Sequence, residues 1–205
     1  QQAGIMSLDA FTIRNLEIFK SLSTQGIHGT LIDTIDQTIT GPGSRLLKNW
    51  LRQPLTDPIK INERLDRIGE FINHPELNES MQNILRETSD LERILAKVAS
   101  GKANPRDIIN AGNTLAKIPT ITKLVNKGNP VLKKLVKRFE NSDTITEKIL
   151  TQIKADPPVT TKKGGYIQAG ISPDLDELRH LSANASQWMA DMQKEEQKNN
   201  NIPSL

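Results

Sequence analysis

The chain of 205 residues contains no cysteine and few aromatic side chains, with four Phe, two Trp and one Tyr. Without cysteine, the sequence excludes a disulfide framework, a thiolate metal site and a cysteine nucleophile. The lack of cysteine fits a reducing compartment, so we expect a cytoplasmic location. The few aromatic rings exclude a stacking platform for single-stranded nucleic acid. They also mean that any core is built from Leu, Ile, Val and Ala.

Long apolar runs are absent as well. No segment approaches the roughly 18–20 apolar residues that span a bilayer, and no signal peptide opens the chain. We therefore expect no membrane partner. The first residue is Gln1 rather than Met, which predicts that the sequence is a piece of a longer protein.

The net charge is small, at +3, and the content of 36% hydrophobic and 25% charged residues is typical of a soluble, helix-rich chain. The charge is uneven, because the stretch from Lys117 to Lys163 holds eleven Lys and Arg against four acids. Such a stretch can attract a phosphate backbone at low salt. A solvated basic helix face has the same composition, so both interpretations stay open.

Residues in catalytic arrangements are missing. The histidines His28, His74 and His180 are scattered, and none has a second histidine at helical spacing for a metal. No serine lies in a Gly-x-Ser-x-Gly turn. Gly165 and Gly170 have the glycine separation of a phosphate loop, but the position that needs Lys holds isoleucine. We predict no catalytic, no cofactor-binding and no metal-binding residue, and a chain that is not itself an enzyme.

Helix signals recur along the sequence. A capping residue is followed directly by proline at Asp57, Asn104, Asn129 and Ser172, and proline suits the first helical position. Apolar residues follow each pair at three- and four-residue spacing. Because no period of 20–50 residues repeats, the pattern predicts an all-α fold, a multi-helix bundle with at most a small β-hairpin.

Several local features are more specific predictions. Residues 1–28 are expected to form a short helix, then an extended segment and a loop at 25–29. The glycines of 41–43 are expected to interrupt the helices, with Thr40 or Ser44 capping the next one. Ser89 and Glu92 have the spacing of a capping box, and the helix after Pro105 is expected to end near residue 119.

The last fifty residues, 156–205, organise the rest of the chain. Ser172 and Pro173 start a helix whose apolar pattern continues to Lys198, a rod of roughly 39 Å at about 1.5 Å per residue. Before it, residues 159–160 and 166–168 are expected to pair as a hairpin. The hinge candidates are Gly164, Gly165 and Gly170. We expect an apolar stripe on the helix to be exposed or covered by a second copy, comprising Leu178, Leu181, Trp188, Met189 and Met192.

A set of motifs runs in order through almost the whole chain. They are Met6-Ser7-Leu8-Asp9-Ala10-Phe11-Thr12, Arg14-Asn15-Leu16-Glu17-Ile18, Gly43-Ser44-Arg45-Leu46-Leu47, Trp50-Leu51, Gln53-Pro54-Leu55, Ile61-Asn62-Glu63-Arg64-Leu65-Asp66, Asp90-Leu91-Glu92-Arg93, Gly101-Lys102-Ala103, Pro105-Arg106-Asp107, Asp156-Pro157-Pro158 and Leu175-Asp176-Glu177-Leu178-Arg179. Together they resemble the MutS family of DNA mismatch-repair proteins, in its bacterial form.

This resemblance implies a helical core domain at residues 1–170 and the first of two lever helices at residues 171–205, leading toward a missing clamp. In that family the levers connect a DNA-gripping clamp to a distant ATPase. The parent protein would then bind mismatched double-stranded DNA, use ATP and Mg²⁺, and act as a homodimer with other mismatch-repair proteins. The sequence lacks the Phe-x-Glu wedge, the clamp and the nucleotide loop of that family. The implied role is therefore to relay conformational change.

Two other functions remain open from the sequence. The chain would also suit a free-standing helical protein-interaction scaffold. It would equally suit a weak, non-specific binder of the DNA backbone that uses the basic stretch from Lys117 to Lys163.

Overall fold

The computed structural model describes residues 4–126, 130–137, 139 and 141–200. Over these residues the prediction of an all-α fold is confirmed. The helices are α1 (Ala10–Asn15), α2 (Leu31–Ile35), α3 (Gly41–Arg52), α4 (Pro58–Asn73), α5 (Pro75–Arg86), α6 (Leu91–Ala99), α7 (Pro105–Leu115), α8 (Ile118–Asn126), α9 (Pro130–Val136), α10 (Asp143–Gln152), the 3₁₀ helix η1 (Thr161–Lys163) and α11 (Pro173–Asn200). Among the described residues, none of these helices is long and apolar enough to cross a membrane.

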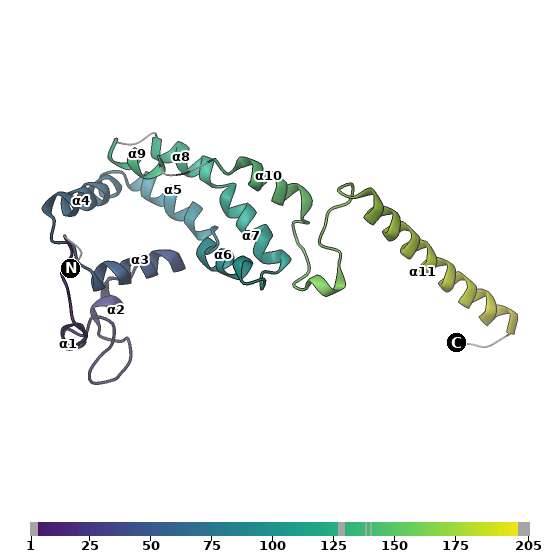
Figure 1. The fold of residues 1–205 in the computed structure, drawn as a ribbon, viewed down its shortest axis with the longest axis horizontal. Coiled ribbons are helices and arrows are strands. Elements are labelled where there is room, and N and C mark those ends of the chain that lie inside the picture. Colours follow the sequence, from purple (N-terminus) through teal and green to yellow (C-terminus); the bar gives the residue numbers. More distant parts are fainter. Residues whose placement is uncertain (1–3, 127–129, 138, 140, 201–205) are drawn as a thin grey trace.

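The molecule is elongated and has three parts in a row (Figure 1). Helices α4–α10 form a central body. Helices α1–α3 lie beside one end of this body, and we call residues 4–56 the N-terminal unit. At the other end, α11 projects away from the body beyond a linker that contains η1 (Figure 1).

The core of the body lies where α8 and α9 pack against α4 and α5. Leu132 of α9 is completely buried, together with Val125 and Val136. Partly buried apolar residues from the neighbouring helices close around them: Phe71, Leu77, Met81 and Ile121. A core of branched aliphatic side chains with a single phenylalanine agrees with the aromatic-poor composition.

Helices α7 and α10 form the most extensively packed pair of the body. Their close approach depends on Gly112, which is buried in α7. A Cβ at this position would lie 2.6 Å from Cγ2 of Ile149 in α10, which is well inside van der Waals contact. Glycine is therefore required here for packing, and the sequence reasoning did not detect it.

The predicted capping devices are largely present. The side chains of Asp57, Asn104 and Ser172 each accept a hydrogen bond from a backbone N–H in the first turn of the following helix. The pair at Asn129 lies outside the described residues. Because each cap satisfies a backbone donor that has no partner within its helix, these positions fix where α4, α7 and α11 begin.

Two local predictions about helix starts were wrong. Residues 41–43 do not interrupt the helices. They form the opening turn of α3, where the N–H of Gly43 donates to Thr40 Oγ1 at 3.1 Å, so Thr40 rather than Ser44 is the cap. The expected capping box of Ser89 and Glu92 is also absent, because Asp90 is the cap of α6.

A true capping box lies one helix later, at the start of α7. The N–H of Asp107 donates to the Asn104 side chain at 2.9 Å, and the N–H of Asn104 donates to Asp107 Oδ2 at 3.1 Å. The box was missed because Asn and Asp replace the usual Ser/Thr and Glu/Gln pair.

Two further segments differ from the predictions. Beyond α1, residues 16–30 turn back on themselves instead of extending, and Glu17 and Gln25 have positive φ angles of 46° and 55°. The helix after Pro105 ends at Leu115, and α8 follows from Ile118, with a proline in its first turn. Proline is tolerated there because the first turn needs no N–H donor, so it marks a helix start rather than an end.

Candidate functional site: the foot of the long helix

The linker from residue 153 to residue 172 connects α10 to α11 and is attached to the body near its start and again at residues 166–168. Arg106 of α7 donates from Nε to the carbonyl oxygen of Pro157 at 2.9 Å and from Nη2 to Asp156 Oδ1 at 3.3 Å. Pro157 is one of the few fully buried side chains of the molecule. The first third of the linker is therefore held against α7.

Gln168 joins the end of the linker to α10. Its side-chain amide donates to the carbonyl oxygens of Leu150 and Ile153, both at 3.0 Å. Its backbone N–H donates to the carbonyl of Gln152 at 2.8 Å. One glutamine thus satisfies carbonyl groups at the C-terminal end of α10 that have no partner within the helix.

The hairpin expected from the sequence is not the pairing observed. Residues 166–168 do not pair with residues 159–160. They pair with the end of α10, in an antiparallel bridge between Ile153 and Ile167. The N–H of Lys154 donates to the carbonyl of Tyr166 at 2.9 Å. Residues 161–163 instead form η1.

Arg179 of α11 binds the same segment from the other side. Its Nη2 donates to the carbonyl oxygen of Ile167 at 2.9 Å, and its Nη1 donates to Asp176 Oδ1 at 2.9 Å. The other oxygen of Asp176 accepts from the N–H of Gly170 at 2.6 Å. The segment 167–170 is therefore hydrogen-bonded to α10 through Gln168 and to α11 through Arg179 and Asp176. We call this arrangement the joint.

The charge state of the joint is fixed at neutral pH. The pKa of Asp176 is lowered from its ordinary value, chiefly by the hydrogen bond from the Gly170 N–H and also by the Arg179 guanidinium. Asp176 is therefore ionised and its carboxylate is already occupied. Asp176 therefore serves the structure of the joint.

The hinge candidates of the sequence lie within or beside the joint. Gly164, Gly165 and Gly170 have φ angles of +63°, +76° and +83°, in the left-handed region that other residues rarely adopt. Gly164 and Gly165 lie between the stretch bound by Arg106 and the stretch bound by Gln168. The backbone is thus most adaptable between two anchored points.

Beyond the joint, α11 leaves the body (Figure 1). The predicted exposure of its apolar stripe is confirmed: the exposed fractions are 63% for Leu178, 58% for Leu181, 66% for Trp188, 60% for Met189 and 49% for Met192. No closely packed helix pair among the described residues includes α11. The orientation of α11 is therefore set by the joint and not by side-chain packing along its length.

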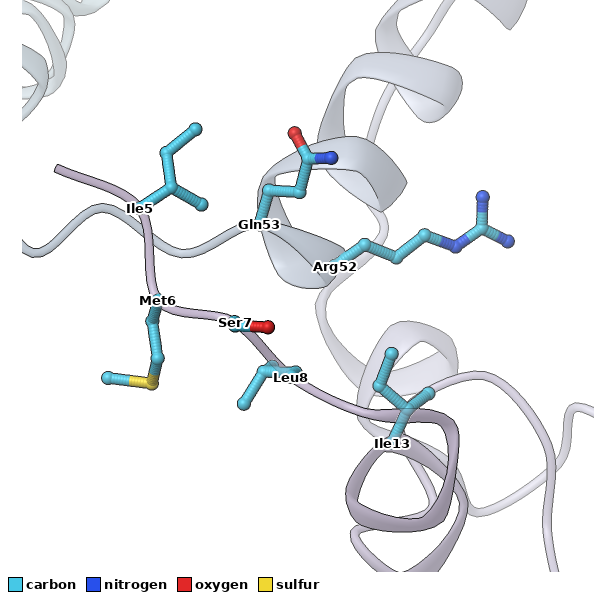
Figure 2. A pocket seen from close by; sticks show the side chains of 7 residues that line it. All are labelled: Ile5, Met6, Ser7, Leu8, Ile13, Arg52 and Gln53. Atoms are coloured by element: carbon cyan, nitrogen blue, oxygen red, sulfur yellow. The ribbon is translucent and has the colours of Figure 1, made fainter. Parts of the chain in front are cut away.

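A hollow of about 500 Å³ lies at the opposite end of the molecule, between the N-terminal segment and the end of α3 (Figure 2). It is lined by Ile5, Met6, Ser7, Leu8, Ile13, Arg52 and Gln53. Arg52 is the one ionisable side chain among these residues, and its guanidinium lies 4.9 Å from the centre of the Phe19 ring. A single cation without an acid or base partner does not form an acid–base site.

The scattered histidines remain apart in the structure. His28 lies 3.2 Å from Asp33, His74 lies at the turn between α4 and α5, and His180 contacts Asn184 in α11. In the described part of the chain, no three His, Asp or Glu side chains lie close enough together to hold a metal ion. Residue 171, where a phosphate loop with this glycine spacing needs lysine, is isoleucine.

The described lysines of the basic stretch from Lys117 to Lys163 are spread over several elements, and Lys127 and Arg138 lie outside the described residues. Lys117 is paired with Glu87, Lys148 belongs to α10, and Lys154 and Lys162 belong to the linker. Lys133, Lys134 and Lys137 lie within and just after α9, where Lys134 and Lys137 are exposed and Lys133 is half-buried. Among the described residues, none of these three lysines has a carboxylate within ion-pair distance.

The sequence reasoning missed the residues that form the joint. It placed the glycines correctly, but it did not assign a role to Gln168, Arg106 or Arg179. Arg106 and Arg179 do lie in two of the motifs quoted above, so the motifs gave a signal of importance without a structural reason. Gln168 has no local signal, because its partners are backbone carbonyls of another helix.

Comparison with known proteins gives a consistent result. The family model described as MutS domain III matches residues 11–202. The chain is similar to the DNA mismatch repair protein MutS of Exiguobacterium sp., with 36% identity over 98% of this chain and 24% of that protein. The proteins of the same name from Methanosarcina mazei and Christiangramia forsetii are 37% and 39% identical, over 98% and 97% of this chain and 23% of each relative. The chain thus spans about a quarter of the length of these relatives.

Proposed function

Because the chain belongs to the MutS domain III family, we propose that it is the helical core and lever of a DNA mismatch-repair protein, and that it relays conformational change between a DNA-gripping part and an ATPase part. In this proposal, residues 1–170 are the core domain and residues 171–205 begin the lever. The relatives are named DNA mismatch repair proteins, and the activity of the whole protein is assigned by that likeness.

One observation carries the relay: the segment 167–168 is hydrogen-bonded to α10 and to α11 at the same time. When α11 turns, the Ile167 carbonyl held by Arg179 is displaced with it. Because Gln168 follows directly in the chain and binds three carbonyls at the end of α10, that displacement is passed to α10.

The body then passes the movement on as a unit. Helix α10 is packed tightly against α7 at Gly112, and closely packed interiors transmit strain instead of absorbing it. Arg106 separately holds the start of the linker, residues 156–157, against α7. Movement at the foot of α11 is therefore delivered to two packed helices of the core.

The proposal for the whole protein covers partners and cofactors as well. It would bind mismatched double-stranded DNA, use ATP with Mg²⁺ in a part that this chain does not contain, and act in the cytoplasm as a homodimer with other mismatch-repair proteins. We assign no catalytic, nucleotide-binding or metal-binding residue to this chain itself.

A proline in the middle of α11 tests the relay. In a mismatch-repair protein that carries this chain, Ala185→Pro removes a helical hydrogen bond and disfavours the helix by about 3 kcal/mol or more. We expect DNA binding and basal ATP hydrolysis to persist, while the effect of mismatched DNA on the hydrolysis rate is lost. Ala185→Ser is the matched control and should retain the effect. Unchanged coupling in the proline variant would contradict the relay.

A second candidate function rests on the lysines of α9. Lys133, Lys134 and Lys137 are close together in the chain, and none has an acidic partner among the described residues. Like charges this close on a helix repel one another by a few tenths of a kcal/mol, and a bound phosphate backbone would relieve that repulsion. The occupant would be duplex DNA, held without sequence preference.

Salt titration of the binding of a fluorescent duplex tests this second function. Each lysine that contacts a phosphate contributes about 0.9 to the slope of log K against log salt. Replacing Lys133, Lys134 and Lys137 by Gln should reduce the slope by about two to three. Replacing Lys148, Lys154 and Lys162 by Gln removes the same charge elsewhere and should change it less. Equal effects of the two triple variants would exclude a site on α9.

A further inference from the structure

Helix α3 meets the body chiefly through side chains near its two ends. It has a strongly amphipathic sequence and, like α4, α5 and α10, contains no fully buried residue. Leu46 and Trp50 are 51% and 37% exposed. The closely packed helix pairs of the described chain all lie within α4–α10, so α3 packs less closely against the body than those helices pack against one another.

Two charged contacts between described residues connect α3 to the body, and Trp50 also lines an apolar hollow with Ile61, Leu65 and Ile68 of α4. Near its start, Arg45 binds Asp90 with both arms of its guanidinium, from Nη1 to Oδ2 at 2.7 Å and from Nη2 to Oδ1 at 2.8 Å. Its Nη2 also donates to Glu92 Oε2 at 2.5 Å. Near its end, the guanidinium of Arg64 in α4 lies 3.9 Å above the Trp50 ring.

Asp90 lies at the N-terminal ends of two helices. Its side chain caps α6 by accepting from the N–H of Arg93 at 3.2 Å. It also faces the first turn of α3, where a Cβ on Gly41 would lie 3.3 Å from Asp90 Oδ2. Both helix ends carry partial positive charge, so this carboxylate is stabilised by two helix dipoles and by Arg45.

The two ends of the N-terminal unit are hydrogen-bonded to each other where the unit meets the body. The N–H of Met6 donates to the carbonyl of Pro54 at 2.8 Å, and the N–H of Thr56 donates to the carbonyl of Gly4 at 3.0 Å. The unit therefore moves as one piece, and the chain enters α4 directly afterwards at Pro58.

We propose that Arg45, Asp90 and Glu92 form an ionic latch that sets the orientation of the N-terminal unit against the body. When the latch opens, the unit turns about residue 57, because α3 belongs to none of the closely packed helix pairs of the described chain. This device is independent of the joint at the other end of the molecule. It also gives a structural reason for two motifs, 43–47 and 90–93, that meet through this contact.

The absence of cysteine makes the latch directly measurable. Cysteines placed at Thr24, in the N-terminal unit, and at Glu79, in α5, are both exposed and can carry spin labels. Electron–electron double resonance then reports the distance between the unit and the body. The test variant is Asp90→Asn, because asparagine caps a helix as well as aspartate but carries no charge for Arg45.

We expect one narrow distance distribution in the unaltered chain and a distribution at least twice as wide in the Asp90→Asn variant. Asp107→Asn is the matched control. It replaces another capping aspartate, which is paired with Lys97 inside the body, and should leave the distribution narrow. Equal widths for the unaltered chain and Asp90→Asn would overturn the latch.

A second label pair, at Glu79 and Asn110, monitors the body itself. If Asp90→Asn also broadens this distance, the loss of the cap has disturbed α6, and Arg45→Gln then decides because it leaves α6 untouched. Broadening of the Thr24–Glu79 distance in Arg45→Gln supports the latch. An unchanged distance in Arg45→Gln overturns it.

Discussion

Helices α7 and α11 begin with the same capping pattern, but α7 is packed in the body and α11 is exposed. Each starts with a capping side chain followed by proline, at Asn104 and at Ser172. Helix α7 is 11 residues long, and five of its residues are buried: Pro105, Ile109, Ala111, Gly112 and Thr114. Helix α11 is 28 residues long and presents an exposed apolar stripe. Local capping therefore determines where a helix begins, and tertiary contacts determine what the helix does.

The largest expected effect is the difference in unfolding free energy between a leucine substitution in the body and one in α11. Leu132 is completely buried in the core, and Leu181 is 58% exposed on α11. We expect Leu132→Ala to lower the free energy of unfolding by about 2–5 kcal/mol. We expect Leu181→Ala to change it by less than about 0.5 kcal/mol. Urea unfolding followed by circular dichroism measures both, and similar losses would show that α11 packs against the body.

The next effect concerns the close approach of α7 and α10. In Gly112→Ala the added methyl group would lie 2.6 Å from Ile149, so we expect a loss of about 1–3 kcal/mol. Gly69→Ala is the matched control, since the same methyl group in α4 would meet no atom within 4 Å. It should stabilise the chain by roughly 0.5–1 kcal/mol through helix propensity. Stabilisation by both substitutions would contradict the packing described for Gly112.

Removing the helix caps should have smaller effects on stability, and these effects should still differ between α7 and α11. We expect Asn104→Ala to lower the free energy of unfolding of the body by about 0.5–2 kcal/mol. Ser172→Ala should remove a similar amount from the first turn of α11 only. Amide hydrogen exchange distinguishes the two outcomes, because exchange should rise throughout the body in the first variant and only near residues 173–176 in the second.

The smallest effect is a pH dependence at the latch. The Arg45 guanidinium, hydrogen-bonded to Asp90, lowers the pKa of that carboxyl from 3.8 to about 2. Because the folded pKa lies below the unfolded one, the contribution of Asp90 is complete above about pH 4 and is lost as the pH falls toward about 2. The Thr24–Glu79 distance should broaden in that window, and the additional broadening should be absent in Asp90→Asn.

The helices could be predicted from the sequence more accurately than the contacts that each helix makes with the rest of the chain. The caps at residues 57, 104 and 172 are local, so their residue types were sufficient to predict them. The pairing of residues 166–168 with α10 was missed, because the β pattern identifies an extended segment but not the strand it joins. The same holds for Gln168, Gly112 and Arg45, whose roles depend on groups 15 or more positions away. The exposure of the apolar stripe on α11 was predicted correctly, because that prediction required no knowledge of a contact with another element.

The measurement that tests the relay most directly is the distance from the body to α11, with spin labels at Glu79 and Lys194. If the joint sets the orientation of α11, the unaltered chain should give one narrow distribution. Arg179→Ala, which loses the contacts to Asp176 and to the Ile167 carbonyl, should give a broad one. Arg86→Ala, at an exposed arginine of α5, should give the narrow distribution again. A distribution as narrow in Arg179→Ala as in the unaltered chain would contradict the account.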